Sequence, residues 1–225
     1  AYLETKQGKQ TARGFAPLEA FDQTPAPAVG LRLASLHTKD GKEEVLLKRA
    51  AAQNLGLYLW FDSQRLSAFE SGDALMVSPR RPINDYNKNL TILPAQVALY
   101  SYDWKKRTAA GEDMENPAAG LGMTEDSQSV PPLAELTAQA QAFYTWDGWR
   151  IREMGAELEN VLPNFPSEPK TGFYACKGDQ IIQVICLETP QGTFVCTTEY
   201  PEGLAGTWGA RFRSALDTLE LISQE

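Results

Sequence analysis

The sequence contains no apolar run near the roughly 18 residues that a membrane-spanning helix needs, so it predicts no transmembrane segment. It is also short of positive charge, since 21 lysines and arginines against 29 aspartates and glutamates give a formal net charge of −8. Affinity for nucleic acid is built from clustered basic residues, so we expect no nucleic-acid partner. The short basic runs Arg80-Arg81 and Lys105-Lys106-Arg107 are interpreted as solvent-facing.

The residues of several kinds of catalytic site are missing as well. His37 is the single histidine and no Gly-x-Ser-x-Gly elbow is present, so no nucleophile and base pair is indicated. We interpret His37 as a surface residue on a hairpin strand. Neither a Walker loop nor a Gly-x-Gly-x-x-Gly fingerprint occurs, and we expect no cofactor.

Metal-binding patterns are equally scarce. Cys176, Cys186 and Cys196 are ten residues apart, which is not the Cys-x-x-Cys spacing of a zinc site. The acidic segment 112–126 offers oxygen ligands but lacks the alternating spacing of an EF-hand loop. We therefore expect no metal site.

The composition fits a globular α+β protein, with 43% hydrophobic and 22% charged residues in 225 positions. The first hundred residues favour β structure, because β-branched and aromatic residues gather between turn signals. Strands are expected at residues 29–38, 44–49, 55–61, 73–78 and within 89–102. Asp40-Gly41 is typical of a two-residue hairpin turn between the first two strands.

The C-terminal part predicts helices and an antiparallel sheet. A helix is expected from Leu133, after Pro131-Pro132, because apolar residues recur there at spacings of three and four. Next, a strand from Trp149 competes with a second helix through Met154, Leu158 and Leu162.

The last sixty or so residues predict three strands, 172–176, 180–189 and 193–200, and a final helix. The middle strand is apolar on both faces, which indicates a central strand covered on each side. An apolar stripe from Trp208 through Phe212 to Leu219 predicts the helix that covers it, with Thr207 as its N-cap.

The charge distribution suggests how the chain is divided. No basic residue lies between Arg107 and Arg150, and residues 108–132 have the composition of a loop without regular structure. We therefore predict a β-rich region 1–107, an acidic loop or linker 108–132 and an α+β unit 133–225. A single domain is the alternative.

The final strands and helix resemble the PsbP-like and DcrB-like families, in residues 181–187, 190–194 and 208–219. The resemblance covers about a quarter of the chain and includes no catalytic motif. It implies an antiparallel sheet covered by helices and an accessory or lipoprotein-like role without catalysis. It transfers no functional residue.

The aromatic run 143–149 supplies the candidate binding residues Tyr144, Trp146 and Trp149, because stacked rings can line a carbohydrate or peptide groove. The competing interpretation is that these rings seal a core. The leading functional prediction is an exported, non-catalytic binding or accessory protein for an unknown protein or small-molecule ligand.

A hydrolase with paired carboxylates is the alternative function. Glycoside hydrolysis requires two acids that flank a cleft, and four acids lie beside aromatic residues: Asp62, Asp103, Asp147 and Glu199. Their competing interpretation is as solvated acids at strand ends.

The expectation of export rests on the first residues. The chain opens on Ala1 and a polar stretch, which fits either a removed export signal or an internal start. A periplasmic, cell-surface or secreted location is expected, with a cytoplasmic one as the alternative.

A disulfide between Cys186 and Cys196 is expected if the compartment is oxidising. A three-residue loop at Pro190-Gln191-Gly192 would place the two cysteines opposite each other. A two-residue loop at Gln191-Gly192 would forbid the bond. Cys176 is expected to stay unpaired and to lie opposite Ile181.

Overall fold

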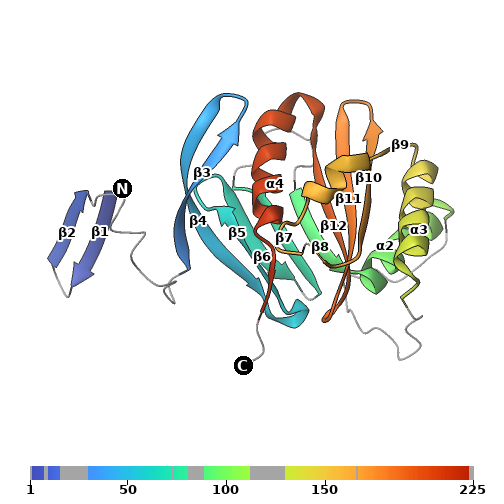
Figure 1. Cartoon of the computed structure of the whole chain (residues 1–225), viewed down its shortest axis with the longest axis horizontal. Helices are drawn as coiled ribbons and strands as arrows, with labels where there is room; N and C mark the ends of the chain where they lie inside the picture. The colour runs from blue at the N-terminus through green and yellow to red at the C-terminus, as the bar shows by residue number, and fades with distance from the viewer. Residues whose placement is uncertain are drawn as a thin grey trace.

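A computed structural model describes residues 2–7, 10–15, 30–71, 73–80, 89–111, 130–165 and 167–222. In this structure the predicted α+β class is confirmed, because antiparallel sheets pack against helices (Figure 1). Strands β1 (Tyr2–Gln7) and β2 (Gln10–Phe15) pair with each other in an antiparallel two-stranded sheet.

The larger sheet has seven antiparallel strands in the order β6-β7-β8-β12-β11-β10-β9. Its strands are β6 (Leu66–Ser71), β7 (Ala74–Pro79), β8 (Asn89–Pro94), β9 (Arg150–Glu153), β10 (Lys170–Lys177), β11 (Gln180–Thr189) and β12 (Gly192–Pro201). Strands from both sides of the predicted 108–132 boundary therefore share one sheet, joined where β8 pairs with β12.

The smaller sheet has four strands in the order β13-β5-β4-β3. These are β3 (Leu31–Thr38), β4 (Gly41–Ala52), β5 (Leu57–Asp62) and β13 (Glu220–Leu221). The β3–β4 hairpin was predicted, but its turn lies at Lys39-Asp40, because Thr38 pairs with Gly41. Gly41 follows the turn at a φ of 119°, a value that favours glycine.

The α-helices among the described residues complete the layers: α2 (Ala95–Ala109), α3 (Leu133–Trp146) and α4 (Ala210–Asp217). Helices α2 and α3 cover one face of the seven-stranded sheet, and α4 and the smaller sheet lie on the other (Figure 1). Short helical turns occur at Gln53–Leu55 (η1), Gly155–Asn160 (η3), Glu202–Leu204 (η4) and Ala205–Gly209 (η5, a π turn).

Strand β11 is central and buried on both faces, as predicted. Ile185 and Leu187 belong to the core between the sheets and α4, whereas Val184 and Cys186 belong to the core beneath α2 and α3. Because successive side chains of a strand point to opposite faces of the sheet, β11 contributes residues to two separate cores.

Helix α2 corrects the prediction that the β structure of residues 89–102 continues to Tyr102. The strand β8 ends at Pro94, whose φ of −55° suits a helix start and whose missing N–H ends a ladder. Ala95 and Ala98, three residues apart, are buried on one side of α2, and Lys106 and Arg107 lie at its C-terminal end, where cations are favoured. The residues in 95–102 that resemble a strand are therefore helical.

The predicted acidic loop 108–132 falls mostly outside the described residues. Its first two residues are helical, since α2 continues to Ala109. Residues 112–129, which carry most of the predicted acidic segment, lie outside the described part of the chain.

The start of α4 also differs from the prediction. Thr207 is not its N-cap, because the helix begins at Ala210 after the η5 turn. The Thr207 hydroxyl instead donates to the carbonyl of Leu204 at 3.2 Å. After α3, the competing strand is the one that forms, as β9, and the helix expected through Met154 is only the η3 turn.

The predicted Cys186–Cys196 disulfide is wrong, because the register of the β11–β12 hairpin differs. The loop is Pro190-Gln191, so Cys186 lies opposite Val195 and Cys196 opposite Ile185. The two thiols consequently face opposite sides of the sheet, and both are free. Cys176 lies opposite Ile181, as predicted.

This register predicts the number of reactive thiols. Since Cys186 and Cys196 face separate cores, we expect three free thiols when the purified protein is denatured without a reductant and titrated with a thiol reagent. A count of one, with peptide mapping that joins Cys186 to Cys196, would contradict the register.

The packing of α4 predicts a large effect of Phe212→Ala. The Phe212 side chain is fully buried between the two sheets, so its truncation should cost about 3–5 kcal/mol of unfolding free energy. Chemical denaturation measures this cost. Phe69→Ala is the matched control, because Phe69 is 47% exposed, and it should change stability by less than about 1 kcal/mol. Equal costs for the two variants would mean that α4 does not anchor the core.

Candidate functional site

The predicted binding residues gather at the C-terminal end of α3, but they do not share one open surface. Tyr144 is 8% exposed, Trp146 is 48% exposed and Trp149 is half-buried. Tyr144 packs edge-on against Trp149 and Phe173, with ring centroids 5.9 and 6.0 Å apart. Burial raises the pKa of the Tyr144 phenol well above its usual value. Tyr144 is therefore a core residue.

The two tryptophans are held by polar neighbours. The Trp149 indole donates to the Asp147 carboxylate at 2.9 Å, and the Lys177 ammonium donates to the Asp147 carbonyl at 2.5 Å. Lys106 lies 6.0 Å from the ring centroid of Trp146. These contacts close the turn after α3, and a binding role for the tryptophans stays a prediction.

The four candidate acids of the hydrolase prediction have separate surroundings. Asp62 is buried and accepts from Arg211 at 2.7 Å, Asp103 lies 4.0 Å from Arg107 on α2, and Asp147 pairs with Lys177. Glu199 on β12 acts with Asp147 in raising the pKa of Tyr144. Asp147 is already engaged by Lys177 and Trp149, so Asp147 and Glu199 do not present two free carboxylates to a cleft.

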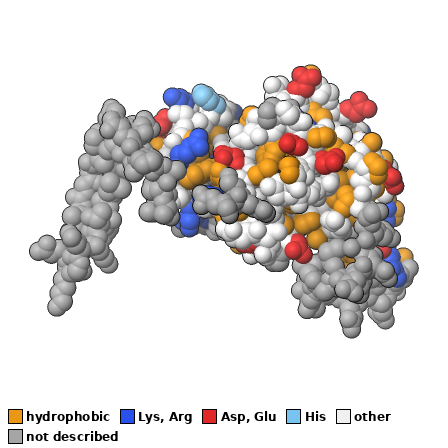
Figure 2. Space-filling view, turned by 60° about the horizontal axis from the view of Figure 1, so that its bottom comes forward, with side chains coloured by type: hydrophobic (Ala, Val, Ile, Leu, Met, Phe, Trp, Pro, Cys, Tyr) orange, Lys and Arg blue, Asp and Glu red, His pale blue; other side chains and the backbone are white. Residues whose placement is uncertain are grey.

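His37 lies exposed on β3, the edge strand of the smaller sheet, as predicted (Figure 2). Among the described residues, no group of histidine, cysteine, aspartate and glutamate is arranged to hold a metal ion. Within the same part of the chain, no helix is both long and apolar enough to cross a bilayer.

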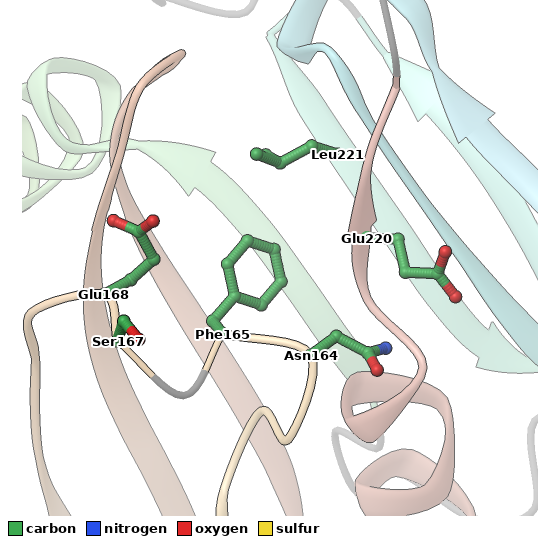
Figure 3. Close-up of a pocket in the computed structure, with 6 residues that line it drawn as sticks. All are labelled: Asn164, Phe165, Ser167, Glu168, Glu220 and Leu221. Carbon is green, nitrogen blue, oxygen red and sulfur yellow. The ribbon is translucent and has the colours of Figure 1, made fainter.

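A pocket that the sequence did not indicate lies beside β13. It has a volume of about 540 Å³ and is open to solvent. Two segments that are more than fifty residues apart form its lining (Figure 3): Asn164, Phe165, Ser167 and Glu168 from the loop before β10, and Glu220 and Leu221 from β13. The apolar part of the lining is Phe165 and Leu221, and the other four residues are polar.

The walls of this pocket are fixed by hydrogen bonds to the end of α4. The Asn164 amide donates to the carbonyls of Leu219 and Asp217, at 3.1 and 3.4 Å. Arg213 donates to the Asp217 carboxylate at 2.9 Å and to the Asn160 carbonyl at 2.7 Å. The loop is thus held against the last turn of α4.

Strand β13 is held equally firmly on the other side. The backbone N–H of Trp60 donates to the Thr218 hydroxyl at 2.8 Å, and Glu220 pairs with Tyr58 in the sheet. The Tyr58 hydroxyl also donates to the Glu220 carboxylate. Burial and then this contact raise the pKa of the Tyr58 phenol.

The two carboxylates of the pocket do not converge. Figure 3 shows Glu168 and Glu220 on either side of Phe165, with the Glu220 carboxylate directed away from Glu168. Glu220 is engaged by Tyr58, whereas Glu168 has no hydrogen-bond or ion-pair partner among the residues that the structure describes. The sequence carries no local signal for this site, because its two segments come together only through α4.

The burial of Tyr144 can be tested by alkaline titration. Burial raises the pKa of the folded Tyr144 phenol above its unfolded value of about 10. Its contribution to stability is therefore fully present below about pH 10 and is lost as the pH rises through the folded pKa. Near pH 11, Tyr144→Phe should therefore leave the phenolate absorbance of the folded protein unchanged, and should remove one tyrosine only in denaturant. Circular dichroism verifies folding at this pH. Loss of one tyrosine from the folded signal would place Tyr144 in contact with solvent.

No protein-family model matches this chain, and no curated protein is detectably similar to it. The resemblance of its last quarter to PsbP-like and DcrB-like domains accordingly stays a prediction, and function is inferred from the residues themselves.

Proposed function

We propose that this protein is a non-catalytic binding or accessory protein that takes a small molecule of mixed polarity into the pocket beside β13. The observation that carries the proposal is the pocket itself, an open cavity lined by two apolar and four polar residues. Its volume lies within the range of roughly 300–1,000 Å³ that is typical of small-molecule sites.

The lining is suited to one amphipathic ligand. Phe165 and Leu221 offer apolar surface, and the Ser167 hydroxyl and Glu168 carboxylate offer a hydrogen-bond donor and acceptors. An apolar ring with one polar substituent would satisfy both parts of the lining.

Preorganisation supports binding at this place. The Asn164 and Thr218 contacts hold both segments of the lining in position without a ligand. A site that is already ordered avoids much of the entropy cost that binding otherwise incurs.

The same geometry favours binding over hydrolysis. A glycosidase needs two carboxylates that face one scissile bond, about 5–10 Å apart, one of them as an acid. In the pocket, Glu220 accepts a hydrogen bond from Tyr58 and is directed away from Glu168 (Figure 3). The exported location remains a prediction of the sequence.

Ligand-observed fluorine NMR with 4-fluorobenzamide tests the proposal. This probe carries one ring and one amide, and a fragment of its size should bind with a Kd of about 1 mM. Ser167→Trp, at an exposed position of the lining, should fill the pocket and weaken binding by about tenfold or more. Ser35→Trp, at an exposed position on β3, is the matched control and should bind as the unaltered protein does.

Two results would contradict the proposal. One is the absence of saturable binding, or equal binding by the Ser167→Trp variant. The other is turnover of a nitrophenyl glycoside that Glu168→Gln abolishes, which would support the hydrolase alternative.

A further inference from the structure

One face of the smaller sheet carries an alternating row of arginines and aromatic rings, here called the arginine–aromatic ladder: Arg32, Trp60, Arg49 and Tyr58. The Arg32 guanidinium carbon lies 5.9 Å from the ring centroid of Trp60. The Arg49 guanidinium carbon lies 3.9 Å from that of Tyr58. Arg49 is also the direct cross-strand partner of Trp60, so the four side chains form one continuous row.

The register places the two arginines at a defined spacing. Arg32 on β3 pairs with Leu47 on β4, and Arg49 follows Leu47 by two residues on the same face. Diagonal neighbours of this kind are about 7–8 Å apart. Burial raises the pKa of Tyr58, and the positive charges of Arg49 and Arg32 partly offset this rise.

Both guanidinium groups are exposed and lack an acidic partner. Arg32 and Arg49 are exposed, and neither forms an ion pair with any residue that the structure describes. Glu220, the cross-strand partner of Tyr58, is an acid beside the row, and its carboxylate is engaged by the Tyr58 hydroxyl. A guanidinium that stacks on a ring keeps its N–H edge available for a carboxylate.

This arrangement is unusual in a chain with a net charge of −8. Figure 2 shows basic side chains near the single histidine, at the end of the molecule where β3 and β4 lie. Two cations fixed over rings, within an acidic protein, provide local charge complementarity for an anion.

We propose that the arginine–aromatic ladder binds an acidic peptide segment in extended conformation, through carboxylates at alternate positions. Side chains two residues apart in a strand lie about 6.6–6.8 Å from each other, which matches the diagonal spacing of Arg32 and Arg49. Each carboxylate would accept two parallel hydrogen bonds from one guanidinium. A nucleic acid is disfavoured, because two arginines neutralise too few phosphates for a chain of this net charge.

Fluorescence anisotropy tests the proposal directly. The probe is a labelled Glu-Thr-Glu-Thr-Glu peptide at low salt, with the Gln-Thr-Gln-Thr-Gln peptide as the uncharged reference. Arg32→Gln/Arg49→Gln should weaken binding of the acidic probe by about tenfold or more, since each bidentate charged contact is worth about that factor. Arg49→Lys keeps the charge but loses the planar fork, and should also weaken binding.

The matched control lies on the opposite face of the same strand. Lys42 and Lys48 are exposed and alternate with Arg49 along β4, so Lys42→Gln/Lys48→Gln removes the same charge elsewhere. We expect this variant to bind within about twofold of the unaltered protein. Thermal unfolding verifies that all variants are folded.

Three outcomes would overturn the inference. They are the absence of binding to the acidic probe, equal losses in the arginine and lysine variants, and tighter binding of an oligothymidylate of equal charge. The pocket beside β13 is not involved in this test, so failure here leaves the proposed function to its own experiment.

Discussion

The position of α4 against the smaller sheet depends on the ion pairs of Arg211. Arg211 is 5% exposed, and it donates to Asp62 of β5 at 2.7 Å and to both carboxylate oxygens of Glu43 on β4. The hydrogen bond from Arg211 holds the pKa of Glu43 below its usual value. A buried cation is tolerated only where it is paired and hydrogen-bonded, so α4 has one stable position against the smaller sheet. The next residue, Phe212, fills the core between the sheets.

The pocket beside β13 follows from this anchor. Once α4 is fixed, its C-terminal end places Thr218 against β5 and presents the Asp217 and Leu219 carbonyls to Asn164. The short strand β13 continues from this point and forms the second wall. Any shift of α4 would separate the two segments of the lining. The arginine–aromatic ladder depends less on α4, because its residues belong to β3, β4 and β5.

The sequence predicted correctly those helices and strands whose apolar residues recur at a regular spacing. Strand β11 has apolar residues on both of its faces, among them Val184, Ile185, Cys186 and Leu187, which indicates burial on both sides. Helix α3 has apolar residues at helical spacing. Helix α2 was missed because Leu99 and Tyr100 suit either state, and only the packing of Ala95 and Ala98 on the sheet decides between them.

Features that depend on distant residues could not be predicted. The Pro190-Gln191-Gly192 sequence is compatible with more than one hairpin loop, so the register depends on which faces of β12 meet the two cores. Arg211 is 149 residues from Asp62 and 168 from Glu43, and no local spacing marks the three as partners. The same holds for the pocket, whose lining is assembled by α4.

A double-mutant cycle on Arg211 and Asp62 tests this anchor most directly. Unfolding free energies from urea denaturation would be compared for Arg211→Met, Asp62→Leu and the double variant. Arg211→Met leaves the buried Asp62 carboxylate unpaired and should cost about 3–5 kcal/mol, whereas Asp62→Leu leaves Arg211 paired with Glu43 alone and should cost less. The double variant removes both charges, so it should cost at least about 2 kcal/mol less than the sum of the two. Small single effects that add up in the double variant would contradict the account.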